Sequence, residues 1–156
     1  MNTKYKDLID QTFVFPQEEF KTENNKLFWH DINLMELIEQ YGSPLKFTYL
    51  PKISENINKA KDWFKQSMKK HKYKGKYFYS YCTKSSHFKY VLDEALKNDI
   101  HIETSSAFDI DIVKNLKKEG KITNKNFVIC NGFKRDKYIE NIADLINSGH
   151  NNCIPI

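Results

Sequence analysis

The sequence predicts an α/β fold built around a parallel sheet. From residue 75 onward, short apolar runs of strand type alternate with amphipathic helical patterns about every 25 residues. This alternation is typical of strand–helix–strand units, whose crossovers are right-handed and whose strands are parallel. We expect three complete strands and the start of a fourth, whereas a closed barrel of such units needs eight. The chain also stops within an apolar run, and we interpret it as the front part of a longer fold.

The first 50 residues are expected to form an N-terminal segment of short strands with one short helix, and residues 51–156 a partial α/β domain. Residues 13–15 and 26–30 have the composition of short strands with a turn between them, which predicts a hairpin. The later strands and helices belong to the second region.

A short helix and another strand are expected after the hairpin. Asp31 would cap the helix, which would stop at residues 41–44, and residues 45–50 alternate like a strand that Pro51 would close. The helical patterns that follow cover residues 52–71, 88–98, 107–119 and 138–146, and the strand patterns cover residues 76–82, 100–104, 126–130 and 153–156.

Residues 76–82 carry the strongest strand signal in the chain. Four of the seven are aromatic, which predicts a strand buried on both faces. Lys84 follows directly, where α/β folds place their chemistry, at the C-terminal end of a buried strand. A partly desolvated lysine amine can become a nucleophile toward carbonyl groups. The alternative is that Lys84 is one of many solvated lysines.

Polar residues also follow the next two strands. A carboxylate with hydroxyl groups occurs at residues 103–106, and an amide with a glycine at residues 131–134. Because parallel strands end at one edge of a sheet, these groups are expected to lie near Lys84. Ser105 and Ser106 can equally be N-caps of the following helix, and Gly132 can simply permit a turn. The chain has no glycine-rich phosphate-binding fingerprint.

Composition excludes several classes of partner. The 156 residues carry a net charge of +5, but Arg135 is the only arginine, and bidentate recognition of nucleic acid favours arginine. No apolar run is long enough to span a membrane, and the N-terminus lacks the features of a signal peptide. We therefore expect neither nucleic acid nor membrane as a partner, and a cytoplasmic location.

The three cysteines predict reduced thiols. Cys82, Cys130 and Cys153 form no CxxC pair, and no histidine lies at ligand spacing from them. An odd number of widely spaced cysteines fits the cytosol, without a disulfide framework or a zinc site. We expect no metal site, and Cys82 and Cys130 to be small buried apolar residues.

Four segments carry a resemblance to a known family. Tyr-Cys-Thr-Lys at 81–84 resembles the Tyr-x-x-Lys signature of the pyridoxal-phosphate decarboxylases with an alanine-racemase-like barrel. Segments 41–45 and 103–109 resemble two further family motifs, in the same order along the chain. Ile-Cys-Asn-Gly-Phe-Lys at 129–134 resembles a segment of the biosynthetic arginine decarboxylases. The resemblance runs from about Tyr5 to the last residue.

The resemblance implies a fold and a reaction. The fold would be the N-terminal portion of a (β/α)8 TIM barrel, preceded by a short β/α segment that belongs to the β-domain. The reaction would be decarboxylation of a small-molecule substrate, the amino acid arginine, to agmatine and CO2 in polyamine biosynthesis. The full-length form would be a homodimer or a larger oligomer.

The resemblance also assigns site residues. Lys84 would be the catalytic residue that bonds to pyridoxal phosphate, and Glu103, Ser106 and Asn131 would bind the same cofactor. Glu103 stands where aspartate is commoner in the family, and Asp109 where glutamate is usual. Ser-Ser at 85–86 replaces a frequent Ala-Asn.

Much of the family's site lies further along the chain than residue 156. This includes the histidine stacked on the cofactor ring, the glycine-rich phosphate loop, the acid facing the pyridine nitrogen and the catalytic cysteine. We therefore expect the 156 residues alone to be inactive. The alternatives are a decarboxylase of diaminopimelate or ornithine, a non-catalytic module that associates with a full-length relative through an exposed sheet edge, and a barrel that carries the cofactor without a substrate. Residues 1–50 count against the last.

Overall fold

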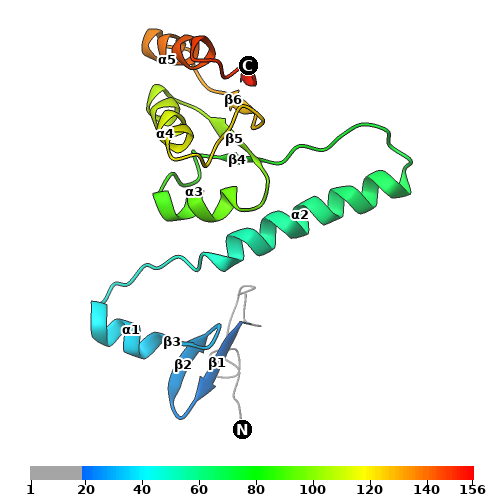
Figure 1. Ribbon diagram of the computed structural model, residues 1–156. Helices are drawn as coiled ribbons and strands as arrows, with labels where there is room; N and C mark the ends of the chain where they lie inside the picture. The colour runs from blue at the N-terminus through cyan, green and yellow to red at the C-terminus, as the bar shows by residue number, and fades with distance from the viewer. Residues whose placement is uncertain (1–18) are drawn as a thin grey trace. The chain divides into compact units, whose positions relative to one another are not determined.

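The computed structural model describes residues 19–156 of the chain. Its internal contacts divide the chain into two compact units, one through Thr48 and one from Tyr49 to Ile156. This division falls two residues before the boundary that the sequence predicts. Each unit is described by itself (Figure 1).

The first unit contains a small antiparallel sheet. Its strands β1 (Phe20–Glu23), β2 (Lys26–Trp29) and β3 (Ile32–Asn33) pair in the order β1-β2-β3. Two-residue turns at Asn24-Asn25 and His30-Asp31 join them, and all four turn residues have positive φ. Such turns match the right-handed twist of paired strands, and Asn and Asp tolerate this conformation best.

The predicted hairpin is therefore formed with a different partner. The strand expected at 26–30 is β2, but its neighbour is β1, whereas residues 13–15 lie outside the described residues. The turn expected between the strands occupies Asn24 and Asn25.

Helix α1 (Leu34–Tyr41) is capped by Asn33, so the prediction that Asp31 caps it is wrong. The Asn33 side chain accepts hydrogen bonds from the backbone N–H groups of Met35 and Glu36, at 3.1 and 3.4 Å. Asp31 lies two residues before the cap, in the turn that joins β2 to β3, where its φ is 62°. Gly42 ends the helix.

The strand predicted at residues 45–50 does not form, and that prediction is wrong. These residues are irregular and end in a turn. Within this irregular segment, Phe47 packs edge-on against Trp29 with ring centroids 5.5 Å apart. Pro51 begins helix α2 instead of closing a strand, which suits proline because the first helical N–H needs no partner.

The second unit contains the predicted parallel sheet. Strands β4 (Ser80–Cys82), β5 (His101–Thr104), β6 (Val128–Cys130) and β7 (Cys153–Pro155) pair in sequence order, all parallel. The parallel α/β fold is thus confirmed. The described residues form an open sheet and no closed barrel.

Helices cover one face of this sheet. They are α2 (Pro51–Lys70), α3 (Lys89–Leu96), α4 (Ala107–Lys118) and α5 (Asp136–Asn147). Figure 1 shows α3, α4 and α5 following one another along one side of the strands. Strand side chains that point toward the helices and the helix side chains that face the sheet form the apolar core together with Ile122: Leu92, Ile102, Ile110, Val113, Leu116, Val128, Cys130, Tyr138, Ile142, Leu145 and Cys153. None of the helices within residues 19–156 is long and apolar enough to cross a membrane.

Strand β4 is shorter than predicted and is not buried on both faces. Only Ser80–Cys82 of residues 76–82 pair with β5, because the register begins at Ser80 and His101. Within residues 49–156 no helix covers the opposite face of β4, and the Phe78 side chain there is 51% exposed. Aromatic content alone therefore predicted the strand but not its length.

Helix α2 is held mainly through its first half. Ile57 is its one buried residue. Asn58 donates to the Asn98 side chain at 2.9 Å, and the Lys61 ammonium donates to the Asn98 carbonyl at 2.8 Å. Beyond Lys61, a stacked contact between Phe64 and Tyr77 supports the helix.

Candidate functional site

The candidate site is the edge of the sheet at which β4 to β7 end. All four strands are parallel, so the residues that follow β4, β5 and β6 are brought to the same edge. Every site residue predicted from the sequence lies there: Lys84, Glu103, Ser106 and Asn131.

Glu103 is the centre of a small polar cluster. Its half-buried carboxylate accepts a hydrogen bond from the Asn131 side-chain amide at 2.9 Å. The Cys82 thiol lies 3.7 Å from the same oxygen, Oε1. Within residues 19–156 no hydrogen bond reaches the second oxygen, Oε2. The cluster therefore fixes the carboxylate through Oε1 and leaves Oε2 able to accept a hydrogen bond from a ligand.

Cys82 was not predicted as a site residue. It is paired with Glu103 in the register of β4 and β5, and side chains of paired residues lie on the same face of a sheet. The sequence could reveal this contact only through the register of β4 and β5, and the register can be derived only when the first residue of each strand is known. The thiol is half-buried, not fully buried as expected.

Two constraints hold Asn131. Its backbone N–H donates to the Thr104 carbonyl at 2.9 Å, and its side-chain oxygen accepts from the Gly132 N–H at 2.6 Å. Gly132 has φ of 91°, and a Cβ at this position would lie 2.6 Å from the Ser105 carbonyl oxygen. Only glycine therefore permits the loop after β6 to approach the loop after β5 so closely.

Lys84 lies in the turn directly after β4 and is exposed. Within the part of the chain that the structure describes, its ammonium forms no hydrogen bond or ion pair. The sheet edge brings it to the same side of the molecule as Glu103, but no contact joins the two. Lys84 is thus an amine without a partner among the described residues, at the same edge of the sheet as the Glu103 carboxylate.

Ser106 is the N-cap of α4. Its hydroxyl accepts from the Asp109 backbone N–H at 3.3 Å, and the Asp109 carboxylate accepts from the Ser105 N–H at 2.8 Å. This arrangement satisfies one N–H group of the first turn, that of Asp109, and the N–H of Ser105, which precedes the cap. The capping alternative considered for Ser106 is thus confirmed, and its contact with a cofactor stays a prediction.

A buried hydroxyl network lies beneath the cluster and was not predicted. The Tyr138 hydroxyl lies 2.9 Å from the Thr104 hydroxyl and donates to the Asn131 carbonyl at 2.9 Å. Burial raises the pKa of Tyr138 to about 12, so the phenol keeps its proton. Tyr138 is seven residues beyond Asn131, and the helical spacing in the sequence identifies it only as a core residue.

Two buried thiols adjoin this network. Cys130 and Cys153 have sulfur atoms 3.4 Å apart on adjacent strands. The hydrogen bond from Cys153 lowers the pKa of the Cys130 thiol, and the same contact together with burial raises the pKa of Cys153. These opposite shifts favour Cys153 as the hydrogen-bond donor and Cys130 as the acceptor.

A second amine lies on the opposite side of Asn131. The Lys134 ammonium donates to the Gly132 carbonyl at 2.8 Å and lies 5.3 Å from the centre of the Tyr138 ring. These contacts occupy Lys134, in contrast to Lys84. Lys134 therefore fixes the loop after β6 and is not an available nucleophile.

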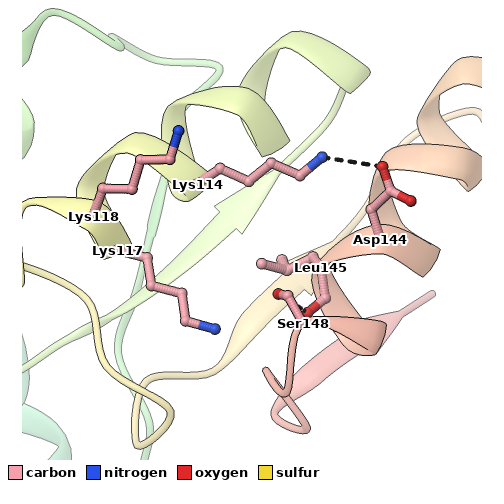
Figure 2. Close-up of a pocket in the computed structure, with 6 residues that line it drawn as sticks. All are labelled: Lys114, Lys117, Lys118, Asp144, Leu145 and Ser148. Carbon is pink, nitrogen blue, oxygen red and sulfur yellow. Dashed lines mark hydrogen bonds and ion pairs between the residues drawn. The ribbon is translucent and has the colours of Figure 1, made fainter.

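Two cavities lie elsewhere in the second unit. One of about 480 Å³ lies between α4 and α5 (Figure 2) and is lined by Lys114, Lys117, Lys118, Asp144, Leu145 and Ser148. These residues belong to the last turns of the two helices and to the residue that follows α5, at the opposite edge of the sheet from the candidate site. Lysines there complement the negative helix ends. A second cavity, of about 560 Å³, lies along α2.

Metal chemistry has no support in the described residues. Across residues 19–156, no three histidine, cysteine, aspartate or glutamate side chains gather so that they could hold an ion. A scan against protein-family models and a search of curated proteins found no match to this chain.

Proposed function

We propose that the chain is the N-terminal part of a pyridoxal-phosphate-dependent decarboxylase that acts on arginine. The observation that carries the proposal is the amine of Lys84, which has no partner among the described residues. It lies two residues beyond the end of β4, on the same sheet edge as the Glu103–Asn131 pair. The segment 129–134, with its resemblance to the arginine enzymes, supports arginine over related substrates.

The chemistry of these side chains fits the cofactor. A lysine amine that no carboxylate holds is free to bond to the aldehyde of pyridoxal phosphate. A fixed carboxylate on the neighbouring strand can accept a hydrogen bond from a ligand through its second oxygen. The close approach of Gly132 to the Ser105 backbone also holds the loops after β5 and β6 together at this edge.

When bound, pyridoxal phosphate supplies the electron sink for the electrons left as CO2 departs. The chain's own residues bind and orient. Lys84 would hold the cofactor through its Nζ atom and give it up to the substrate's amine. Asn131 and Cys82 would hold Glu103 in place, and Oε2 of Glu103 would accept a hydrogen bond from the ligand.

Covalent trapping tests the proposal. The chain is incubated with pyridoxal phosphate, reduced with borohydride and digested, and the modified peptides are mapped by mass spectrometry. We expect label concentrated on Lys84 and lost in Lys84→Ala. Lys76→Ala is the matched control, because Lys76 is an exposed lysine on the other side of β4 and its removal should leave the label in place.

Label spread evenly over the exposed lysines would contradict a cofactor site at this edge. Release of CO2 from carboxyl-labelled arginine, ornithine and diaminopimelate is measured in parallel. We expect none from this chain alone, because the resemblance places the other site residues further along the chain. Turnover without label on Lys84 would also contradict the proposal.

A further inference from the structure

We propose that Asn131 is a modification site, at which the side-chain amide is lost as ammonia by reaction with the backbone nitrogen of Gly132. The proposal concerns groups of the chain itself and does not depend on the decarboxylase function. It rests on the loop after β6, where a reactive pair of residues, a close contact and a buried hydroxyl group meet.

The sequence of this loop permits the reaction. Asn131-Gly132 is the one Asn-Gly pair in the chain. The backbone nitrogen that follows an asparagine can attack the side-chain carbonyl carbon and close a succinimide ring, and glycine has no Cβ to shield its nitrogen. A Cβ at position 132 would lie 2.6 Å from the Ser105 carbonyl oxygen. The residue that makes the asparagine labile is therefore the one that the fold requires there.

The structure holds the two reacting groups together. The Gly132 N–H donates to the Asn131 side-chain oxygen at 2.6 Å, so the side chain is turned back onto the peptide bond that follows it. The Asn131 Nδ2 atom donates to Glu103 at 2.9 Å, which keeps the side chain in this orientation. An unfolded chain reaches such an approach only by rotation about several bonds. The fold therefore removes part of the entropic cost of ring closure.

The Tyr138 hydroxyl favours the loss of the proton that starts the reaction. When the Gly132 nitrogen gives up its proton, negative charge spreads to the carbonyl oxygen of the same peptide group, which is that of Asn131. The Tyr138 hydroxyl donates to this oxygen at 2.9 Å, and its pKa, raised by burial to about 12, keeps it a donor. A donor placed where charge develops stabilises that charge. The Lys134 ammonium, 2.8 Å from the Gly132 carbonyl oxygen, adds positive charge to the same loop.

The reaction uses only water and hydroxide. Hydroxide takes the Gly132 proton, the nitrogen forms a bond to Asn131 Cγ, and the bond between Cγ and Nδ2 breaks. Nδ2 leaves as ammonia with a proton taken from water, which restores the hydroxide. Water then opens the ring at Cγ, which gives aspartate, or at the backbone carbonyl carbon, which gives isoaspartate.

Either product breaks the polar cluster of the candidate site. The Nδ2 donor is replaced by a carboxylate oxygen beside Glu103, and two carboxylates so close together repel each other. Isoaspartate also lengthens the main chain where Gly132 packs against Ser105. The amide of Asn131 is therefore the part of the site that is lost with time.

Peptide mapping tests the modification. The folded chain is incubated at mildly alkaline pH in heavy-oxygen water, which marks the oxygen gained, and amide loss at each asparagine is followed by mass spectrometry. We expect Asn131 to react at least tenfold faster than Asn147, the internal control, which is followed by Ser148. We also expect Asn131 to react at least as fast in the folded chain as in urea. An Asn131 that reacts in urea but stays intact in the folded chain would overturn the proposal.

Tyr138→Phe tests the hydroxyl group. This variant should lose the Asn131 amide at least threefold more slowly than the unaltered chain when folded, and at the same rate in urea. Tyr90→Phe is the matched control at a tyrosine that is 72% exposed, and it should keep the original rate in both states. Circular dichroism checks that both variants are folded. A folded Tyr138→Phe chain that reacts as fast or faster would overturn the part assigned to Tyr138.

Asn131→Asp tests the consequence for Glu103, because it carries one product of the reaction. Its urea midpoint should lie below that of the unaltered chain at pH 7, where both carboxyl groups are charged. The two midpoints should converge below the ordinary carboxyl pKa of about 4, where protonation removes the repulsion. Equal midpoints at pH 7 would show that the amide does not hold Glu103.

Discussion

The hydroxyl groups of Tyr138 and Thr104 form a buried hydrogen bond of 2.9 Å that links α5 to the end of β5. The Tyr138 hydroxyl also donates to the Asn131 carbonyl, so one phenol connects two strand ends of the candidate site. Both side chains are almost fully buried. The geometry of Asn131, and through it of Glu103, therefore depends on a residue that no ligand would touch.

Replacement of Tyr138 by phenylalanine should destabilise the chain. The change leaves the Thr104 hydroxyl and the Asn131 carbonyl without this partner in a buried place, which costs about 1–3 kcal/mol of the free energy of unfolding. Urea unfolding followed by circular dichroism measures the loss. Tyr90→Phe, at a tyrosine that is 72% exposed, is the control and should have no effect. Equal midpoints for the two variants would show that the network adds no stability.

Gly132→Ala should cost more stability than Gly149→Ala. Both glycines have φ near 90°, so both variants bear the strain of an L-residue with positive φ. Only at Gly132 does the new Cβ also meet backbone, the Ser105 carbonyl. The excess loss, about 1–3 kcal/mol for such backbone conflicts, isolates the close approach of the two loops. Thermal or urea unfolding of both variants measures it, and equal losses would argue against that approach.

Acid should weaken the contacts of the residues at the end of α4. Hydrogen bonds from Lys121 and Lys89 lower the pKa of Glu119 from its ordinary 4.5 to about 2. A carboxyl whose pKa is lower in the folded chain contributes stability above pH 4.5 and loses it as the pH falls toward 2. We expect the urea midpoint to fall over this window, and to fall less in Lys121→Gln. The difference should shrink in high salt, because these side chains are partly exposed. Equal slopes would contradict the linkage.

Thiol reagents should distinguish the three cysteines. Cys82 is half-buried, whereas Cys130 and Cys153 are buried. In the native chain we expect one thiol to react with a colorimetric disulfide reagent within minutes, and the other two only in denaturant. Cys82→Ala should abolish the fast reaction. Three fast thiols would mean that β6 and β7 are not packed as described.

Local patterns predicted the elements of the second unit well. Helix α4 begins at Ala107 and its cap is Ser106, as the spacing of its apolar residues indicated, because helical periodicity is a local property. Strand limits were less accurate, since a strand ends where its neighbour ends. Residues 76–82 illustrate this, because β5 provides partners only from His101 onward.

The first unit shows how turn geometry overrides a local signal. Asp31 and Asn33 are both good N-caps, and composition cannot choose between them. The choice follows from the two-residue turn at His30-Asp31, which takes Asp31 before the helix begins. A correct prediction needed the pairing of β2 with β3, which involves only Phe28 and Trp29 on β2.

The candidate site was predicted in part. The rule that parallel strands end at one edge brought Glu103 and Asn131 together, and the structure places their side chains 2.9 Å apart. Cys82 and Tyr138 were missed as site residues because their contacts depend on register and on the position of α5. Whether Lys84 bonds to a cofactor is a matter of chemistry that no pattern of spacing can decide.

The unequal attachment of α2 has a mechanical consequence. Its contacts with Asn98 end at Lys61. About two further turns of the helix follow, and within the described residues Tyr77 is the main residue that packs against them. Amide hydrogens near Lys70 should exchange with solvent much sooner than those near Ile57. Proteases that cut after lysine should cleave the chain first between Ile57 and Lys70. The first half of α2 is thus firmly attached to the rest of the second unit, whereas its last turns unfold locally more easily.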